Sequence, residues 1–401
     1  MSNIKEKSLF FSLLLFHFIL LLFIVDDFSL SYKEVEVIFS NSSFIGVVSN
    51  FFIDVFGQND FAVRFPFILF YLGSAIVLYL LTDDYFRHKI DRLITIAIFM
   101  ILPGVNTAAL LVNESIVVIF FTLLYLYLYK LYEKEHYILL TLFLFIDNSF
   151  AILYLALFFY SLKKKDNILL VVSLILFGLS MSIYGFDIGG HPRGYFVDTF
   201  GILASIFSPL LFIYFLYSIY RVGLKWEKDM YWYISTTALS LVLLFSLRQK
   251  VEVSDFAPFI VIAIPIMVRL FMHSYRVRLK EYRKKHFTFA AFTLFILILN
   301  FLVLIFSKSL YPFFENPEKH FTYKHHIVKE LAEQLKKQNI DALFVDDIAL
   351  QKRLEFYGIH NGNDIRLVIK NIHDKEYDIE VKYSNVVVAR FDIIELNSVS
   401  K

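Results

Sequence analysis

The chain has 401 residues, of which 58% are hydrophobic, and its mean hydropathy is +0.62. Soluble domains rarely repeat apolar runs of span length, so this composition excludes an ordinary soluble protein and predicts a polytopic α-helical membrane protein. The absence of cysteine excludes disulfides and thiolate metal sites, and a net charge of +2 indicates no particular partner.

The first apolar run covers residues 8–25 and follows two lysines. It ends in an Asp-Asp pair, where a cleaved signal peptide would have small residues, so we expect a retained helix with a cytoplasmic N-terminus. The polar interruption at residues 26–60 is too long for a turn. We predict that it forms a loop at the outer face of the membrane.

Further apolar runs of span length continue to residue 306. They predict transmembrane helices at residues 61–81, 93–110, 115–131, 167–184, 201–220, 230–247, 256–273 and 287–306. The helix at 93–110 is expected to break near Pro103-Gly104. Basic loops follow the second and fourth runs, on the side of the N-terminal lysines, as the positive-inside rule expects.

The run 137–162 decides the predicted topology, because Asp147 and Asn148 lie at its middle. A single helix would hold a carboxylate near the centre of the bilayer, which costs several kcal/mol. Two half-helices that turn at Asp147 return the lysine run 163–165 to the cytoplasmic side. We therefore predict a hairpin, about 11 transmembrane helices in total, and a membrane domain at residues 1–310.

Beyond residue 310 the composition becomes that of a soluble domain. Helical spacing predicts helices at residues 323–337 and 349–357. Short apolar runs predict strands at residues 340–345, 365–369, 377–382 and 386–391. We expect a small α/β domain at residues 311–401, on the outer, periplasmic face.

Three carboxylates are candidates for acid–base chemistry. Glu34 and Glu36 lie just beyond a membrane boundary, where a carboxylate can accept a proton from an incoming hydroxyl or amine. Glu114 begins the fourth predicted helix. The alternative interpretation is structural: an amphipathic interfacial helix would carry the first two, and the helix dipole would stabilise the third.

Cations on the predicted outer side run against the positive-inside rule. Arg248 and Lys250 lie between two spans, and Arg193 follows His191 in another outer loop. Because Arg and Lys bind phosphoryl oxygens strongly, a lipid-linked phosphate is a natural partner. An internal ion network with nearby carboxylates is the alternative.

The stretch from Gly57 to Pro66 resembles a motif of the GT-C glycosyltransferases, in particular the protein O-mannosyltransferase and aminoarabinose-transferase group. There, Gly-x-x-x-x-x-x-Arg-x-Pro leads into the second helix, as Gly57, Arg64 and Pro66 do here. The hairpin and the outer α/β domain also fit this resemblance. The Asp-Glu motif of the family falls on Lys33-Glu34, so a lysine replaces its catalytic aspartate.

The resemblance implies a glycosyltransferase of a bacterial-type inner membrane, which moves a sugar from a polyprenyl-phosphate carrier to an outer-face acceptor. The expected catalytic residues are Glu34, as the base, with Glu36 and Glu114 in support. The residues expected to bind the carrier phosphate are Arg248, Lys250, Arg193, His191 and Arg64.

The expected partners are membrane lipid and the lipid-linked donor, with no nucleic acid. No sequence pattern requires a metal or cofactor, although a divalent cation is compatible with the carboxylates. The alternative function is a catalytically silent relative that binds lipid-linked sugar or scaffolds a membrane complex. A transporter is disfavoured because ionisable residues at the midplane are sparse.

Overall fold

The computed structural model describes residues 3–185, 194–372, 374, 376–383 and 385–396. The chain forms two compact units, each built from two segments. The first unit comprises Met1–Ile19 and Phe67–Phe301, and the second comprises Leu20–Pro66 and Leu302–Lys401. The first outer loop, which the sequence led us to place in the membrane domain, therefore shares a unit with the C-terminal segment.

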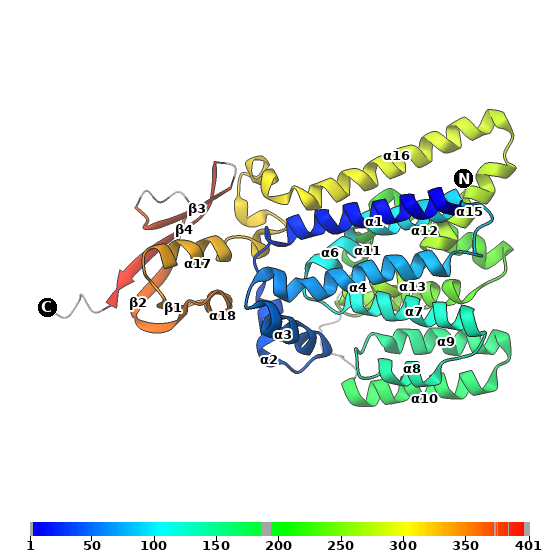
Figure 1. Ribbon diagram of the computed structural model, residues 1–401, viewed down its shortest axis with the longest axis horizontal. Helices are drawn as coiled ribbons and strands as arrows, with labels where there is room; N and C mark the ends of the chain where they lie inside the picture. Colours follow the sequence, from blue (N-terminus) through cyan, green and yellow to red (C-terminus); the bar gives the residue numbers. More distant parts are fainter. Residues whose placement is uncertain (1–2, 186–193, 373, 375, 384, 397–401) are drawn as a thin grey trace. The chain divides into compact units, whose positions relative to one another are not determined.

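Helices make up the first unit. Three of them contribute residues to both units: α1 (Asn3–Val25), α4 (Asp60–Leu81) and α16 (Lys280–Ile305). The others are α5 (Lys89–Ile101), α6 (Pro103–Leu110), α7 (Ser115–Tyr132), α8 (Tyr137–Phe143), α9 (Phe150–Lys164), α10 (Asn167–Tyr184), α11 (Phe196–Phe207), α12 (Pro209–Lys225), α13 (Met230–Ser246), α14 (Val253–Val261) and α15 (Ile264–Val277) (Figure 1). The polytopic helical class predicted from the sequence is confirmed.

Proline accounts for two of the breaks in this unit. The α5–α6 pair bends by 55° before Pro103, as predicted, and the α11–α12 pair bends by 102° before Pro209. A residue that precedes proline disfavours the helical region, while proline itself suits the first helical turn. The spans predicted at 201–220 and 256–273 are both bent helix pairs in the structure, since α14 and α15 also meet at a bend of 43°.

The number of membrane spans depends on how the bent pairs are counted. Among the described residues, five helices are long and apolar enough to cross a membrane, and up to nine spans result if each bent pair is one span. The predicted total of about 11 also included α13 and both halves of the hairpin, which are shorter. That total stays a prediction.

Basic loops gather at one end of the first unit. Arg92, near the start of α5, donates to Glu6 in the first turns of α1, with 2.9 Å between Nη1 and Oε1. Arg276, near the end of α15, forms a bidentate pair with Asp91 at 2.5 and 2.7 Å. These contacts place the N-terminus of α1, the loop before α5 and the end of α15 at a single end, which we call the basic end.

The predicted hairpin at Asp147 is confirmed. Lys164 at the end of α9 lies 3.4 Å from Glu135, which immediately precedes α8, so the two helices fold back on each other. Lys130 near the end of α7 donates to the carbonyl of Leu81, at 3.1 Å, and so this end of the hairpin lies at the basic end. In Figure 1, α8, α9 and α10 run side by side.

The second unit combines two short helices of the first loop with the C-terminal domain. The loop helices, α2 (Tyr32–Ser40) and α3 (Phe44–Phe56), meet at an angle of 84°. The C-terminal elements are the 3-10 turns Ser307–Phe313, Pro317–Lys319 and Tyr323–His325, helices α17 (Val328–Lys337) and α18 (Ile348–Phe356), and strands β1 (Ala342–Val345), β2 (His360–Lys370), β3 (Ile379–Tyr383) and β4 (Val386–Glu395). The predicted α/β domain is present.

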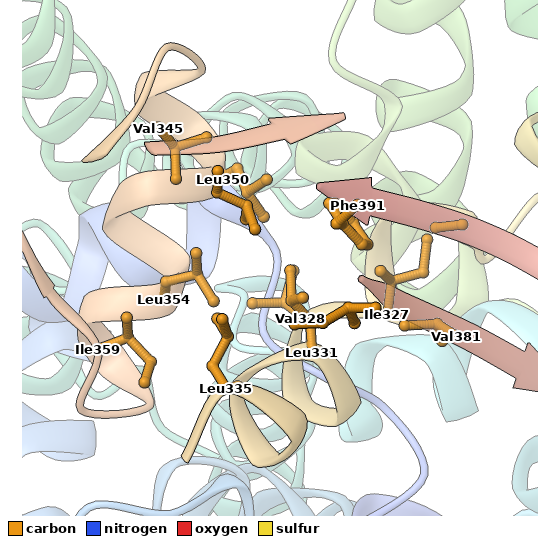
Figure 2. Close-up of a cluster of buried hydrophobic side chains, with 14 of the residues drawn as sticks. Ile327, Val328, Leu331, Leu335, Val345, Leu350, Leu354, Ile359, Val381 and Phe391 are labelled. Atoms are coloured by element: carbon orange, nitrogen blue, oxygen red, sulfur yellow. The ribbon is translucent and has the colours of Figure 1, made fainter. Parts of the chain in front are cut away.

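The strands form one sheet in the order β1-β2-β4-β3, with β1 parallel to β2 and the other pairs antiparallel. In α17, Val328, Leu331 and Leu335 follow the 3-4-7 spacing of an amphipathic helix and are buried against the sheet. Figure 2 shows these side chains with Leu354 of α18 and Phe391 of β4 in one core. This core supports the helix ends that carry the polar residues described below.

Candidate functional site

A cavity of about 630 Å³ lies in the first unit, at the end away from the basic loops, and we call it the polar cavity because Lys250, Glu252 and Asn113 line it among mostly apolar residues. Ser115 and Ser205 from α7 and α11 line it, together with Lys250, Glu252 and Asn113 from the connections. Lys130 stands near the other end of α7, at the basic end. Because α7 rises about 1.5 Å per residue, roughly 25 Å of helix separates the cavity from the basic end.

Two candidate segments that are distant in sequence meet at this cavity. The Ser115 hydroxyl donates to the carbonyl of Ser254 at 2.9 Å, which ties the start of α7 to the start of α14. Glu114 lies between the lining residues Asn113 and Ser115, and it is among the charged neighbours of Asp255. The structure thus brings Glu114 and Lys250 to the same part of the first unit.

Arg248 is exposed, two residues before Lys250 on the connection from α13 to α14. His191 and Arg193 lie outside the described residues. The segment that follows them begins at Tyr195, whose amide donates to the carbonyl of Ser246 at 2.9 Å. That bond places the end of this loop beside the start of the segment that carries Arg248 and Lys250.

Glu34 and Arg64 occupy a buried ion network in the second unit. Glu34 lies at the third position of α2 and closes a capping box: its Oε2 accepts from the amide of Ser31 at 2.7 Å and from the Ser31 hydroxyl at 2.8 Å. Its Oε1 lies 3.4 Å from Arg64 Nη2. Both side chains are almost fully buried, at 3% and 0% exposure.

Arg64 uses its guanidinium to hold the chain that leaves α1. It donates to the carbonyls of Val25 at 3.2 Å and Ser29 at 3.1 Å, and also to that of Phe28. Asp60, one turn earlier in α4, lies 3.9 Å from it. The arginine of the Gly57–Pro66 motif is therefore enclosed by its own loop, with no exposed surface for a ligand.

Residues from the C-terminal domain complete the network. Tyr357, just after α18, donates to Asp60 at 2.6 Å and accepts from the amide of Leu30 at 2.9 Å. Lys329 at the start of α17 lies 3.2 Å from Asp60, and Arg353 of α18 donates to the carbonyl of Leu30 at 2.7 Å. The first loop and the C-terminal helices are therefore joined by charge-assisted hydrogen bonds.

The surroundings of Glu34 set its protonation state. Burial alone would raise the pKa of this carboxyl, but the Arg64 guanidinium and nearby His325, 3.5 Å from Oε2, hold the pKa well below its usual range. An ionised carboxylate so strongly stabilised is a weak base. Glu36 differs, because it is half exposed and its only close partners are Tyr32 at 3.3 Å and Lys352 at 4.0 Å among the described residues.

Several residues of this network were missed from the sequence. The Ser31-x-x-Glu34 spacing is a capping-box signal, and it indicated a capping role for Glu34 that the structural alternative given above did not include. Lys329, Arg353 and Tyr357 carry no local signal, because only the fold brings them to the first loop. Among the described residues, no group of three or more His, Cys, Asp or Glu side chains is arranged to hold a metal ion.

Comparison with known proteins agrees with the fold. The family described as dolichyl-phosphate-mannose-protein mannosyltransferase matches residues 44–177, which include the Gly57–Pro66 motif and Glu114. No curated protein sequence matches the chain.

Two solved structures of ArnT from Cupriavidus metallidurans are similar to this chain at 11% sequence identity. The apo structure matches with a TM-score of 0.56, over 90% of this chain and 86% of that chain. The structure bound to undecaprenyl phosphate matches with a TM-score of 0.54, over 90% and 85%. The chain thus shares the fold of these ArnT structures, which agrees with the GT-C resemblance of its sequence.

Proposed function

We propose that this protein is a membrane glycosyltransferase that takes a sugar from a polyprenyl-phosphate carrier, and that the carrier phosphate binds in the polar cavity of the first unit. The observation that carries this proposal is Lys250 at a cavity that Asn113 and Glu252 also line, in a chain with the GT-C fold. A volume of about 630 Å³ is typical of small-ligand sites. The ArnT structure that binds undecaprenyl phosphate supports a lipid phosphate as the ligand class.

The chemistry needs a cation for the leaving group and a base for the acceptor. When the bond between the sugar and the phosphate oxygen breaks, negative charge grows on the departing polyprenyl phosphate, and Lys250 stabilises it there. Arg248, two residues away, supplies a second positive charge. Glu252 lines the same cavity and takes the proton of the attacking acceptor group, with Glu114 at the cavity edge in support.

Glu34 has a different role in this proposal from the one that the sequence suggested. It is enclosed with Arg64 and it is a weak base, so it acts as a positioning residue that fixes the start of α2. Lys33 replaces the family's aspartate directly before it. The proton acceptor is therefore assigned to the cavity of the first unit.

The cavity faces the outer side of a bacterial-type inner membrane in this proposal. The support is the charge distribution of the first unit: the basic loops gather at one end, and the cavity lies at the other. Positively charged loops stay in the cytoplasm, so the cavity end is the outer end.

The test is release of carrier by the purified protein in liposomes, with undecaprenyl phosphate that bears radiolabelled mannose or aminoarabinose as donor. Lys250→Ala removes the leaving-group cation, and we expect turnover to fall by about 100-fold. Glu252→Gln keeps the shape of the side chain but removes the base, and we expect its turnover to fall by a similar factor. Lys134→Ala, an exposed lysine after α7, is the matched control and should keep full turnover. Unchanged turnover in Lys250→Ala would refute the proposal.

One observation favours a second function, a silent relative that only binds lipid-linked sugar. The only carboxylate at the family's Asp-Glu motif, Glu34, is buried in an ion pair. A silent relative would bind the donor, lose affinity in Lys250→Ala, and release no carrier in any variant.

A further inference from the structure

A second cavity, of about 450 Å³, lies between α5, α12, α15 and α16 in the first unit. Most of its wall is aliphatic or aromatic, and the side chains include Ile98, Leu211, Met267, Phe271 and Phe289. Among the described residues, it shares no lining residue with the polar cavity. It is therefore a separate site, with the chemistry of a hydrocarbon chain rather than of a sugar phosphate.

Four of the polar residues that line this cavity lie near the basic end, in the part that we call its mouth. They are Ser274, Tyr275, Arg278 and His286. Arg278 donates from Nε to the Ser274 hydroxyl at 3.3 Å, which holds its guanidinium at the mouth. The lining residues of α15, from Tyr275 back to Ile264, extend over about 17 Å of helix. The cavity thus combines a cationic mouth with an apolar interior.

The chain around the mouth is strongly basic. Between residues 276 and 287 there are six cations and a single carboxylate, Glu281. Arg276 is paired with Asp91, and the other five are Arg278, Lys280, Arg283, Lys284 and Lys285. The positive-inside rule explains cations at a cytoplasmic end without any ligand. The positive-inside rule does not explain why an open apolar cavity lies next to these cations.

The cavity also lies beside the lateral surface of the unit. Of the 26 residues in α16, only Thr293, Leu297 and Phe301 are buried. Phe287 and Phe289, which line the cavity, are 61% and 52% exposed. A bilayer lipid can therefore enter between α15 and α16 without crossing the protein interior.

We propose that this cavity binds an anionic phospholipid of the leaflet at the basic end, with one acyl chain between α12, α15 and α16 and the phosphate at Arg278. Charge complementarity favours this occupant, because basic pockets between transmembrane helices bind anionic lipid headgroups. The lipid fills the cavity between α15 and α16, contacts both helices, and so holds α16 against α15. The proposal is independent of the glycosyltransferase function, since it uses no residue of the polar cavity.

The test is native mass spectrometry of the delipidated full-length protein, titrated with phosphatidylglycerol and with phosphatidylcholine that has the same acyl chains. For the wild type we expect phosphatidylglycerol to bind about tenfold more tightly. The double change Arg278→Ala and Lys285→Ala should abolish this preference and leave chain binding in place. Ala290→Trp, which fills the cavity, should weaken both lipids. Lys163→Ala and Lys165→Ala together, also at the basic end, are the matched control and should change neither.

Equal affinity for the two lipids, or full phosphatidylglycerol binding in Ala290→Trp, would overturn the proposal. If Ala290→Trp does not fold, the double change Arg278→Ala and Lys285→Ala still tests the proposal, because an unchanged preference for phosphatidylglycerol in that variant would overturn it. Undecaprenyl phosphate is titrated as a third lipid. If it binds more tightly than phosphatidylglycerol with the same sensitivity to the variants, the cavity belongs to the carrier and the assignment to a bilayer phospholipid is wrong.

Discussion

At the scale of single residues, Arg64 has the most demanding position in the second unit. It neutralises the buried carboxylate of Glu34 and also caps three carbonyls at the end of α1. Taking two charges out of water is costly, and the hydrogen bonds of both groups offset much of that cost, although Arg64 Nε has no partner among the described residues. Removal of one partner leaves the other group charged and buried without its counter-charge.

Arg64→Ala is therefore expected to destabilise the second unit by about 3–5 kcal/mol. Arg64→Lys keeps the charge, but its three donors on one nitrogen cannot reach Glu34 and all three carbonyls as the Arg64 fork does, so an intermediate loss is expected. The measurement is the thermal unfolding midpoint in detergent. Glu36→Gln is the control, because its half-exposed side chain should change stability by less than about 0.5 kcal/mol. An unchanged midpoint in Arg64→Ala would contradict the geometry of this network.

His326 makes the stability of the second unit depend on pH. Burial, then the nearby Lys308 charge, lowers the pKa of His326 to about 3, and burial also lowers the pKa of His320. Between pH 6.5 and 3 the unfolded chain binds a proton at His326 that the folded chain excludes, so stability falls as the pH drops. The slope for one such group is up to about 1.4 kcal/mol per pH unit.

The measurement is the urea midpoint between pH 7.5 and 6, where Glu34 is almost fully ionised in both the folded and the unfolded state and adds little slope of its own. His326→Gln should flatten the dependence, with His320 left as the smaller contributor. His88→Gln, an exposed histidine of the first unit, is the control and should leave the slope as it is. Equal slopes in the wild type and His326→Gln would show that His326 is accessible to protons in the folded state.

At the scale of elements, the residue at the break between α11 and α12 has an unusual backbone conformation. Ser208 has φ +75° and ψ +136°, its side chain is fully buried, and among the described residues its hydroxyl has no hydrogen-bond partner. A non-glycine residue with positive φ is strained, and a buried hydroxyl without a partner is unfavourable.

Ser208→Gly removes both penalties, so we expect it to stabilise the first unit by about 1 kcal/mol. Ser205→Gly, in the exposed part of α11, is the matched control and should destabilise by a similar amount, because glycine weakens a helix interior. Unfolding midpoints of the two variants in detergent measure the difference. Loss of stability in Ser208→Gly would mean that this backbone is not strained.

The elements differ in how far the sequence could predict them. The hairpin followed from the high cost of Asp147 in a lipid-spanning helix, and Glu135 with Lys164 bears it out. The break at Ser208-Pro209 was missed because proline in membrane helices often causes only a kink, and no charge marked the site. The network around Arg64 could be predicted only in part, because Asp60 lies one helical turn away in the same helix but Lys329 and Tyr357 reach the network only through the fold.

At the scale of the whole molecule, the orientation that we propose in the membrane rests on the different charges at the two ends of the first unit. Since the chain has no cysteine, single cysteines can report sidedness in intact bacterial cells. We expect a membrane-impermeant maleimide to label Lys250→Cys without permeabilisation. Lys165→Cys and Lys284→Cys, at the basic end, should be labelled only after permeabilisation. Labelling of Lys165→Cys in intact cells would contradict the proposed orientation.

In the proposed function, the carrier phosphate binds in the polar cavity next to Lys250. The most direct measurement is photocrosslinking with an undecaprenyl phosphate analogue that bears its photoreactive group next to the phosphate, followed by mapping of the modified peptides. We predict adducts on residues 103–119 and 250–261, reduced in Lys250→Ala and unaffected in Lys134→Ala. Adducts confined to residues 264–294, around the apolar cavity, or spread evenly over the helices, would contradict the account.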